Sequence, residues 1–273
     1  FTQSGENDFS KPSVIVANHQ SHLDLICLMA LNPKLIFFTN EWVWKNPIYG
    51  YVIRKADYIP VNDGVEAHLD KIRALVERGY SLVIFPEGTR TVDGSIGRFH
   101  KGAFYVASEL GLDITPVYIH GAYDVLPKTD FMLREGSVNV EVGPRIPCSK
   151  DYRSMTKVCH RIFVSHYAEL RRTLETPEYL SVYVWYKYLY KGADVESRCR
   201  KALARVNDVA FLREVPSGNH FEIHGCGQGE YALIFALMHP EIEVNAYDRD
   251  EDNVMLASNI SCLPANLHFH LEL

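Results

Sequence analysis

Short apolar runs alternate with amphipathic stretches through the first 145 residues, and this alternation constrains the fold more than any other feature of the sequence. The runs are rich in β-branched or aromatic residues and are bounded by Gly, Pro, Asn or Asp, as strands usually are. We predict strands at Ser13–Ala17, Leu35–Phe38, Asp57–Val61, Leu82–Phe85, Ile114–Ile119 and Val138–Val142. Apolar residues about 3.6 positions apart predict helices at Leu23–Leu31, Val65–Arg78 and Gly102–Leu110. Such alternation indicates an α/β sheet covered by helices.

The rest of the chain divides into a helical part and a second α/β part. From Lys150 to about Arg213 the pattern is helical, and Pro177 is expected to divide it into two helices. After Pro216, alternating strands and helices are predicted at Phe221–His224, Glu230–Met238, Glu243–Tyr247, Asp252–Ile260 and Leu267–His270. We therefore expect a domain at residues 1–172, a helical connector at 173–215 and an incomplete βαβαβ unit at 216–273.

Composition narrows the classes of function. Hydrophobic residues make up 47% and charged residues 23%, which excludes a disordered chain. The net charge of −6 disfavours nucleic-acid binding, because nucleic-acid-binding proteins usually carry a basic surplus. The cysteines lack any C-x-x-C pair, which fits a reducing compartment rather than a zinc ribbon. No apolar run reaches the roughly 18 residues of a membrane span, and the start resembles the interior of a longer chain.

A histidine and an aspartate follow the first predicted strand. In Asn18-His19-Gln20-Ser21-His22-Leu23-Asp24, the carboxylate of Asp24 can hold the Nδ1–H of His19. The Nε2 atom is then free to take a proton from a hydroxyl. The same spacing also fits a surface histidine beside the acidic first turn of a helix, so the pair alone does not define a catalytic site.

A polar turn follows another predicted strand, in Phe85-Pro86-Glu87-Gly88-Thr89-Arg90. Gly88 permits a positive φ or a close backbone approach, and the guanidinium of Arg90 suits a phosphate or carboxylate. Thr89 adds a hydroxyl donor. Further along, Lys101 stands at a predicted helix start, where anions are favoured. The alternative is a strand-ending turn with a solvated arginine.

These segments, together with Ile114-Thr115-Pro116-Val117, resemble blocks one, three and four of the lysophospholipid (1-acylglycerol-3-phosphate) acyltransferases. The resemblance covers about Val14 to Arg172 and implies a glycerolipid acyltransferase-like mixed sheet flanked by helices. It implies that His19 is a general base oriented by Asp24, with no need for a Ser or Cys nucleophile or a metal. It also implies an acceptor-binding set, with Arg90 on the head-group anion: Glu87, Gly88, Thr89, Arg90 and, assisting, Lys101.

One departure concerns the acceptor. The family's second block usually ends in an arginine that grips glycerol phosphate, whereas the matching stretch here ends in Val61. Loss of one charge-assisted bond costs about 1.5–3 kcal/mol of binding. An acceptor other than lysophosphatidic acid therefore stays open, as does replacement of that arginine by Arg54 or Lys55.

Two segments suggest contact with a membrane surface. The aromatic stretch Leu35–Tyr51 suits a bilayer interface or, equally, an aromatic core under a loop. The basic residues of the expected connector suit anionic head groups or a solvated helix face: Lys187, Lys191, Arg198, Arg200, Lys201 and Arg205. We expect the chain at the cytoplasmic side of a membrane, as a peripheral protein or as part of a larger membrane-anchored polypeptide.

A glycine-rich turn opens the last part. Gly225-Cys226-Gly227-Gln228-Gly229 lies between a predicted strand and helix, and Asp248 ends the next strand. This arrangement resembles the start of class I S-adenosylmethionine-dependent methyltransferases, which have a Rossmann-like fold. The resemblance implies cofactor contacts at Gly225, Gly227, Gly229 and Asp248. The chain stops after the third of about seven strands, so we expect S-adenosylmethionine to serve a longer parent chain, as in bacterial multifunctional lipid-processing fusions.

Three functions follow from these features. The leading one is transfer of an acyl group from acyl-CoA or acyl-carrier protein to a hydroxyl of a lysophospholipid-like acceptor. The second is a methyl-donor-binding domain with the acyltransferase part as scaffold. The third is a catalytically silent lipid-binding module.

Overall fold

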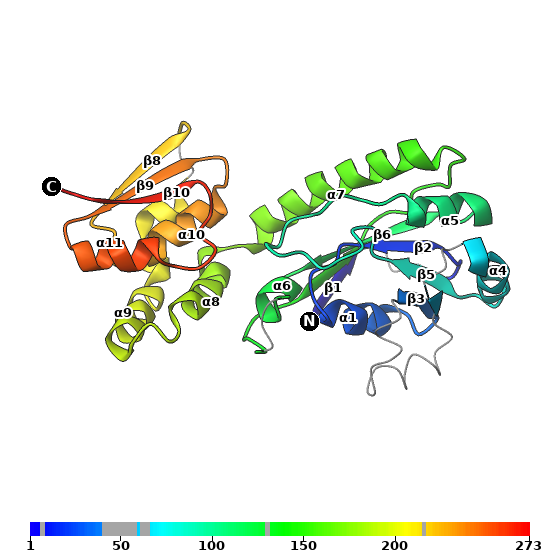
Figure 1. The fold of residues 1–273 in the computed structure, drawn as a ribbon, viewed down its shortest axis with the longest axis horizontal. Helices are drawn as coiled ribbons and strands as arrows, with labels where there is room; N and C mark the ends of the chain where they lie inside the picture. The colour runs from blue at the N-terminus through cyan, green and yellow to red at the C-terminus, as the bar shows by residue number, and fades with distance from the viewer. Residues whose placement is uncertain (6–8, 40–58, 61–65, 129–131, 215–216) are drawn as a thin grey trace. The chain divides into compact units, whose positions relative to one another are not determined.

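The structure, a computed structural model, describes residues 1–5, 9–39, 59–60, 66–128, 132–214 and 217–273 (Figure 1). The chain forms two compact units. The first comprises Phe1–Leu133 and Ser137–Ala168, and the second comprises Arg134–Gly136 and Glu169–Leu273. We describe each unit by itself.

The described residues of the first unit contain a seven-stranded sheet in the order β1-β7-β6-β2-β5-β3-β4. Neighbouring strands are parallel except for the antiparallel pair β6–β7, so the sheet is mixed, as expected. The strands are β1 (Thr2–Gly5), β2 (Val14–Ala17), β3 (Leu35–Thr39), β4 (Ile59–Pro60), β5 (Ser81–Ile84), β6 (Ile114–His120) and β7 (Asn139–Val142).

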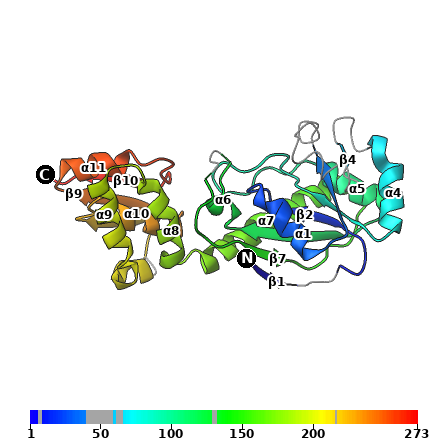
Figure 2. The same ribbon diagram turned by 90° about the horizontal axis from the view of Figure 1, so that it is seen from below.

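Helices cover both faces of this sheet (Figures 1 and 2). The helices are α1 (Leu23–Leu31), the 3₁₀ turn η1 (Glu66–His68), α4 (Leu69–Glu77), α5 (Gly102–Leu110), α6 (Ala122–Val125) and α7 (Tyr152–Leu174). Ile15 and Ala17 of β2 pack with residues of α1 and α6 on one face. All four residues of β2 are buried, because a central parallel strand is covered on both sides.

Two features of the first unit differ from the sequence-based expectation or lie beyond it. Strand β1 was not expected, because its sequence Thr2-Gln3-Ser4-Gly5 is polar and every residue is exposed. It forms by pairing its backbone with β7 at the sheet edge. Of the strand expected at Asp57–Val61, only Ile59–Pro60 lies among the described residues, as β4. Most of the aromatic stretch, together with Val61, Arg54 and Lys55, lies outside them.

The second unit contains, among its described residues, a three-stranded parallel sheet in the order β10-β9-β8. The strands and helices alternate as expected: β8 (His220–His224), α10 (Glu230–Met238), β9 (Glu243–Asp248), α11 (Glu251–Ser258) and β10 (Leu267–Leu271). They are preceded by α8 (Pro177–Tyr188), α9 (Ala193–Leu203) and two 3₁₀ turns, η2 (Val206–Asp208) and η3 (Ala210–Arg213). Pro177 is the first residue of α8, so the break expected there is present. The described helical part has three α-helices, α7, α8 and α9, rather than the two expected, because the chain also turns at Tyr190 and Gly192, which have positive φ.

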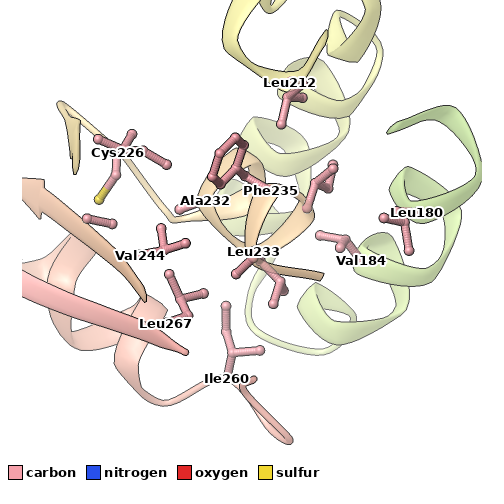
Figure 3. Close-up of a cluster of buried hydrophobic side chains, with 14 of the residues drawn as sticks. Leu180, Val184, Leu212, Cys226, Ala232, Leu233, Phe235, Val244, Ile260 and Leu267 are labelled. Carbon is pink, nitrogen blue, oxygen red and sulfur yellow. The ribbon is translucent and has the colours of Figure 1, made fainter. Parts of the chain in front are cut away.

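The helices of the expected connector pack into the core of the second unit. Leu180 and Val184 of α8 belong to the same buried cluster as Leu233 and Phe235 of α10 (Figure 3). Helix α10 is apolar around most of its circumference, so one side packs on the sheet and the other requires a cover. Residues 173–215 and 216–273 therefore form one unit, which differs from the three parts expected from the sequence.

No helix among the described residues combines the length and apolar character that crossing a bilayer requires.

The packing of α7 on the sheet can be tested at Phe163. Its fully buried ring lies 5.2 Å from the ring of Phe99 and 4.7 Å from that of Tyr118, between ring centroids. We expect Phe163→Ala to lower the free energy of unfolding by about 3–5 kcal/mol, measured by denaturant titration, because it leaves a cavity. Val164→Ala, on the exposed side of the same helix, should change it by less than about 0.5 kcal/mol. Equal losses in the two variants would contradict this packing.

Candidate active site

His19 and Asp24 form a hydrogen-bonded pair at the end of β2. The Nδ1 atom of His19 lies 2.8 Å from Oδ2 of Asp24, which is fully buried in the first turn of α1. Because a carboxylate only accepts, Nδ1 carries the proton and donates it, and Nε2 keeps its lone pair. The imidazole is one-fifth exposed, so a substrate can approach it. The structure thus brings together the two residues that the sequence predicted as base and orienter.

The carboxylate of Asp24 is held by the backbone of its own loop. Its Oδ2 atom also accepts from the N–H groups of Gln20, at 2.7 Å, and Ser21, at 2.9 Å. Three donors therefore converge on one oxygen. This fixes the carboxylate where it meets the imidazole.

The loop that carries the pair is itself anchored by the side chains of three of its residues. The amide of Asn18 accepts from the N–H of Ile119 and donates to its carbonyl, both at 2.8 Å. The side chain of Gln20 donates to the Tyr167 hydroxyl of α7. The hydroxyl of Ser21 donates to the carbonyl of Leu126 at 2.8 Å. Separate anchors on β6, α7 and the segment after α6 thus fix the path of the loop that carries the pair.

Glu87 ties the second polar segment to His19. Its Oε1 accepts from the His19 N–H at 2.9 Å and its Oε2 accepts from the Gly97 N–H at 2.7 Å. The carboxyl is buried, and burial raises its pKa, although the two N–H donors oppose that rise. Glu87 thus holds protein backbone with both oxygens, whereas the sequence suggested that it contacts the acceptor. A Cβ on Gly97 would lie 2.8 Å from Oε2, so the close approach requires glycine.

The turn after Glu87 lies beside His19. The Thr91 N–H donates to the His19 carbonyl at 2.8 Å, and the imidazole stacks on the Phe85 ring at 4.0 Å between centroids. Gly88 adopts the positive φ expected of it, +71°. Since residues on both sides of the turn contact His19, Arg90 belongs to the same site as the histidine–aspartate pair.

Arg90 and His22 interact electrostatically with the His19–Asp24 pair. Burial lowers the pKa of Arg90, and the negative charge of Asp24 opposes this. Burial also lowers the pKa of His22, and the positive charges of Arg90 and His19 add to that effect. These effects favour the neutral form of His22, while the negative charge of Asp24 opposes them in part.

A lysine that the sequence reasoning missed reaches this turn. The Nζ atom of Lys128 donates to the Thr89 hydroxyl at 2.9 Å and to the Arg90 carbonyl at 3.2 Å. No local pattern marked Lys128, because it follows α6, almost forty residues further along the chain. Lys101, which the sequence did suggest, is exposed at the start of α5. Its ammonium makes no hydrogen bond or ion pair within the described part of the chain.

The predicted residues of the second unit gather at one turn between β8 and α10. Gly225, Gly227 and Gly229 all have positive φ, at +66°, +58° and +89°. Asp248 accepts from the Gly227 N–H at 2.7 Å through Oδ2 and from the Asp250 N–H at 2.9 Å through Oδ1. Burial would raise the pKa of Asp248, but these and other donors outweigh it and keep that pKa below its ordinary value.

Comparison with known proteins shows what the first unit resembles. Residues 2–120 match the family model described as Acyltransferase. The chain is 33% identical over 145 residues to the chloroplastic 1-acyl-sn-glycerol-3-phosphate acyltransferase LPAT1 of Arabidopsis thaliana. This match covers 51% of this chain and 40% of that protein. The human 1-acyl-sn-glycerol-3-phosphate acyltransferase beta is 27% identical over 175 residues, 60% of this chain and 63% of that protein.

A solved structure shares the fold of the first unit. The crystal structure of the 1-acyl-sn-glycerophosphate acyltransferase PlsC from Thermotoga maritima superposes with a TM-score of 0.56 at 23% identity. The match covers 62% of this chain and 71% of that one. The match spans less than half the length of the relatives from Arabidopsis thaliana, Brassica napus and Chlamydomonas reinhardtii, 40–44% of each.

The hydrogen bonds of Glu87 to the backbone of His19 and Gly97 can be tested with Glu87→Gln. The amide keeps one acceptor oxygen but sets its NH₂ group against a backbone N–H, so one hydrogen bond is lost. We expect kcat/KM for acyl transfer to fall about tenfold, because a bond to a charged group contributes about 1.5–3 kcal/mol. The substitution Glu109→Gln, on the outer side of α5, should leave kcat/KM within twofold.

The same variant tests the electrostatics of Glu87. A carboxyl whose pKa is raised on folding stabilises the protein most below its unfolded pKa, and this contribution is lost as the pH rises through the folded pKa. The difference in unfolding free energy between wild type and Glu87→Gln should therefore shift in favour of the variant from pH 4.5 upward. A difference that shifts toward the wild type over this range would contradict the raised pKa.

Proposed function

We propose that this protein transfers a fatty acyl group from an acyl thioester, acyl-CoA or acyl-carrier protein, to a hydroxyl of a lysophospholipid-like acceptor. One observation carries the proposal. The His19 Nδ1–Asp24 Oδ2 hydrogen bond of 2.8 Å lies beside the Arg90 turn, in a domain that matches the Acyltransferase family.

The chemistry begins with proton removal. The Nε2 atom of His19 takes the proton from the acceptor hydroxyl as its oxygen attacks the thioester carbonyl. The tetrahedral intermediate then collapses with cleavage of the C–S bond, and the imidazolium returns its proton to the leaving thiolate. The products are an ester and a free thiol. Asp24 fixes the tautomer and stabilises the imidazolium, and such base catalysis contributes about 10²–10⁴ in rate.

The turn supplies the acceptor site. Arg90 binds the head-group anion through its planar guanidinium, while Thr89 contributes a hydroxyl and Gly88 lets the backbone come close. Lys101 adds positive charge at the start of α5. The names of the plant and human relatives support 1-acyl-sn-glycerol 3-phosphate as the acceptor. The position of Val61 lies outside the described residues, so the proposal stands on the Arg90 turn.

We place the protein at the cytoplasmic side of a membrane, where such acceptors are found, as a peripheral protein or as part of a larger membrane-anchored polypeptide. Ile26 and Met29 on the outer face of α1 support this, since they are 65% and 45% exposed. The basic helices support it less. Lys187 donates to the carbonyl of Ser261, and the Arg200 guanidinium lies over the ring of Trp185.

The catalytic assignment is tested by His19→Ala and Asp24→Asn. We expect His19→Ala to lower kcat by about 10²–10⁴-fold because the base is lost, and Asp24→Asn to lower kcat because the charge and the tautomer control are lost. Product mass spectrometry with mixed lysolipids and both donor types gives the rates and names the acceptor. The exposed His220→Ala serves as control. Undiminished turnover by a folded His19→Ala variant would refute the base.

A second candidate function concerns the glycine turn of the second unit. The left-handed Gly225 and Gly227 leave open space beside the N-terminus of α10, and Asp248 closes the turn beneath them. This supports a site for S-adenosylmethionine that serves methyl transfer in a longer parent chain, within a multifunctional lipid-processing protein. The described sheet of the second unit has three strands, in the order β10-β9-β8.

Calorimetry with S-adenosylmethionine tests the second candidate. We expect heat of binding that Gly227→Val abolishes, since Gly227 lies at φ +58° and a side chain there would be strained and would fill the open space. Absence of binding to the unaltered chain would dismiss this candidate and leave the acyl-transfer proposal untouched.

A further inference from the structure

Arg90 and Lys128 meet at the same turn, where the Lys128 ammonium donates to the backbone carbonyl of Arg90. Neither side chain makes an ion pair within the described residues, although acidic residues outnumber basic ones in the chain, 34 to 28. An uncompensated pair of positive charges at one turn attracts anions from solution.

Lys128 is held at the turn by neutral oxygens. Its ammonium donates to the Thr89 hydroxyl at 2.9 Å and to the Arg90 carbonyl at 3.2 Å. An ammonium has three N–H donors, so one remains after these two bonds. A hydroxyl and a carbonyl fix the position of the ammonium but leave its charge unneutralised. Lys128 thus presents a positioned charge and a spare donor beside Arg90.

The neighbouring carboxylates form no ion pair with Arg90 or Lys128 among the described residues. Both oxygens of Glu87 bond to backbone N–H groups, and the carboxylate of Asp93 accepts from the Ser95 and Thr91 hydroxyls. Asp24 bonds to His19 and acts on Arg90 only through its electrostatic field. Both cations of the turn therefore lack a directly bonded carboxylate in the described part of the chain.

We propose that Lys128 is a second head-group-binding residue of the acceptor site and that, with Arg90, it selects acceptors that carry a phosphate monoester. A phosphate monoester bears about 1.5 to 2 negative charges at pH 7, which two cations match. A phosphodiester bears one, and a monoacylglycerol bears none. This inference rests on the proposed acyl transfer and names the residue that sets its acceptor preference.

Kinetics with Lys128→Met test the inference. The methionine keeps most of the length of the side chain and removes the charge. We expect KM for 1-acyl-sn-glycerol 3-phosphate to rise about tenfold or more, with kcat within twofold, because a charge-assisted contact to bound substrate is lost. The kinetics for monoacylglycerol should not change. Lys128→Arg should restore most of the affinity, and Lys157→Met, on the exposed side of α7, should leave all values unchanged.

Two outcomes would overturn the inference. An equal loss with every acceptor would mean that Lys128 only holds the turn through Thr89 and the Arg90 carbonyl. An unchanged KM for the phosphate monoester would mean that its charge does not reach the acceptor.

A binding measurement separates this inference from the proposed function. Calorimetry with sn-glycerol 3-phosphate on the His19→Ala variant, with and without Lys128→Met, requires no turnover. We expect the second substitution to weaken binding about tenfold. If the unaltered protein transfers no acyl group but binding still depends on Lys128, the acyl-transfer proposal fails and the anion site stands. Binding that is indifferent to Lys128 refutes the site whatever the activity.

Discussion

The site depends on one hydrogen bond, from Nδ1 of His19 to the buried carboxylate of Asp24. An imidazole is an effective base only if the correct nitrogen is unprotonated and points toward the substrate. The folded protein must fix this orientation before the substrate binds. Three residues of the loop hold the imidazole in place through separate hydrogen bonds. Asn18 bonds to β6, Gln20 to α7 and Ser21 to the segment after α6. None of these contacts is local in sequence, so the pair exists only in the folded first unit.

The sheet topology explains why these distant segments meet. Strands β5 and β6 flank β2 and both run parallel to it, so the carboxyl ends of all three lie at the same edge of the sheet. The segment after β2 carries His19, the one after β5 carries the Arg90 turn, and the one after β6 leads through α6 to Lys128. Functional groups in α/β sheets gather at this edge for the same reason. Helix α7 reinforces it from one face, where His160 Nε2 lies 3.1 Å from the carbonyl of Gly97, whose N–H holds Glu87.

Sequence patterns predicted the elements with strong local signals. Helices α1 and α5 have the predicted bounds, because apolar spacing coincides there with clear end residues such as Asn32 and the left-handed Gly111. Helix α10 has them because its apolar run lies between Gly229 and His239. The polar edge strand β1 carried no such signal, since only its backbone pairs. The sequence predicts a connector at α8 and α9, because their amphipathic or aromatic patterns indicate helices but do not show which element each helix packs against. Only the structure shows that α8 covers α10.

The same distinction holds at the site. Block order and spacing single out His19, Asp24 and Arg90 as candidates from the sequence. The hydrogen bonds of Glu87 to two backbone N–H groups and the contact of Lys128 with Thr89 depend on tertiary structure. A single sequence holds no pattern that predicts such contacts.

The tautomer of His19 is the most direct test of this account. Long-range ¹H–¹⁵N correlation spectra of the ¹⁵N-histidine-labelled protein, with His19→Gln used for assignment, report which ring nitrogen carries the proton. The account predicts a protonated Nδ1 and a bare Nε2 in the neutral ring of the wild type, with this preference lost in Asp24→Asn. A His19 signal with the proton on Nε2 would contradict it, since the atom meant to take the acceptor proton would already hold one.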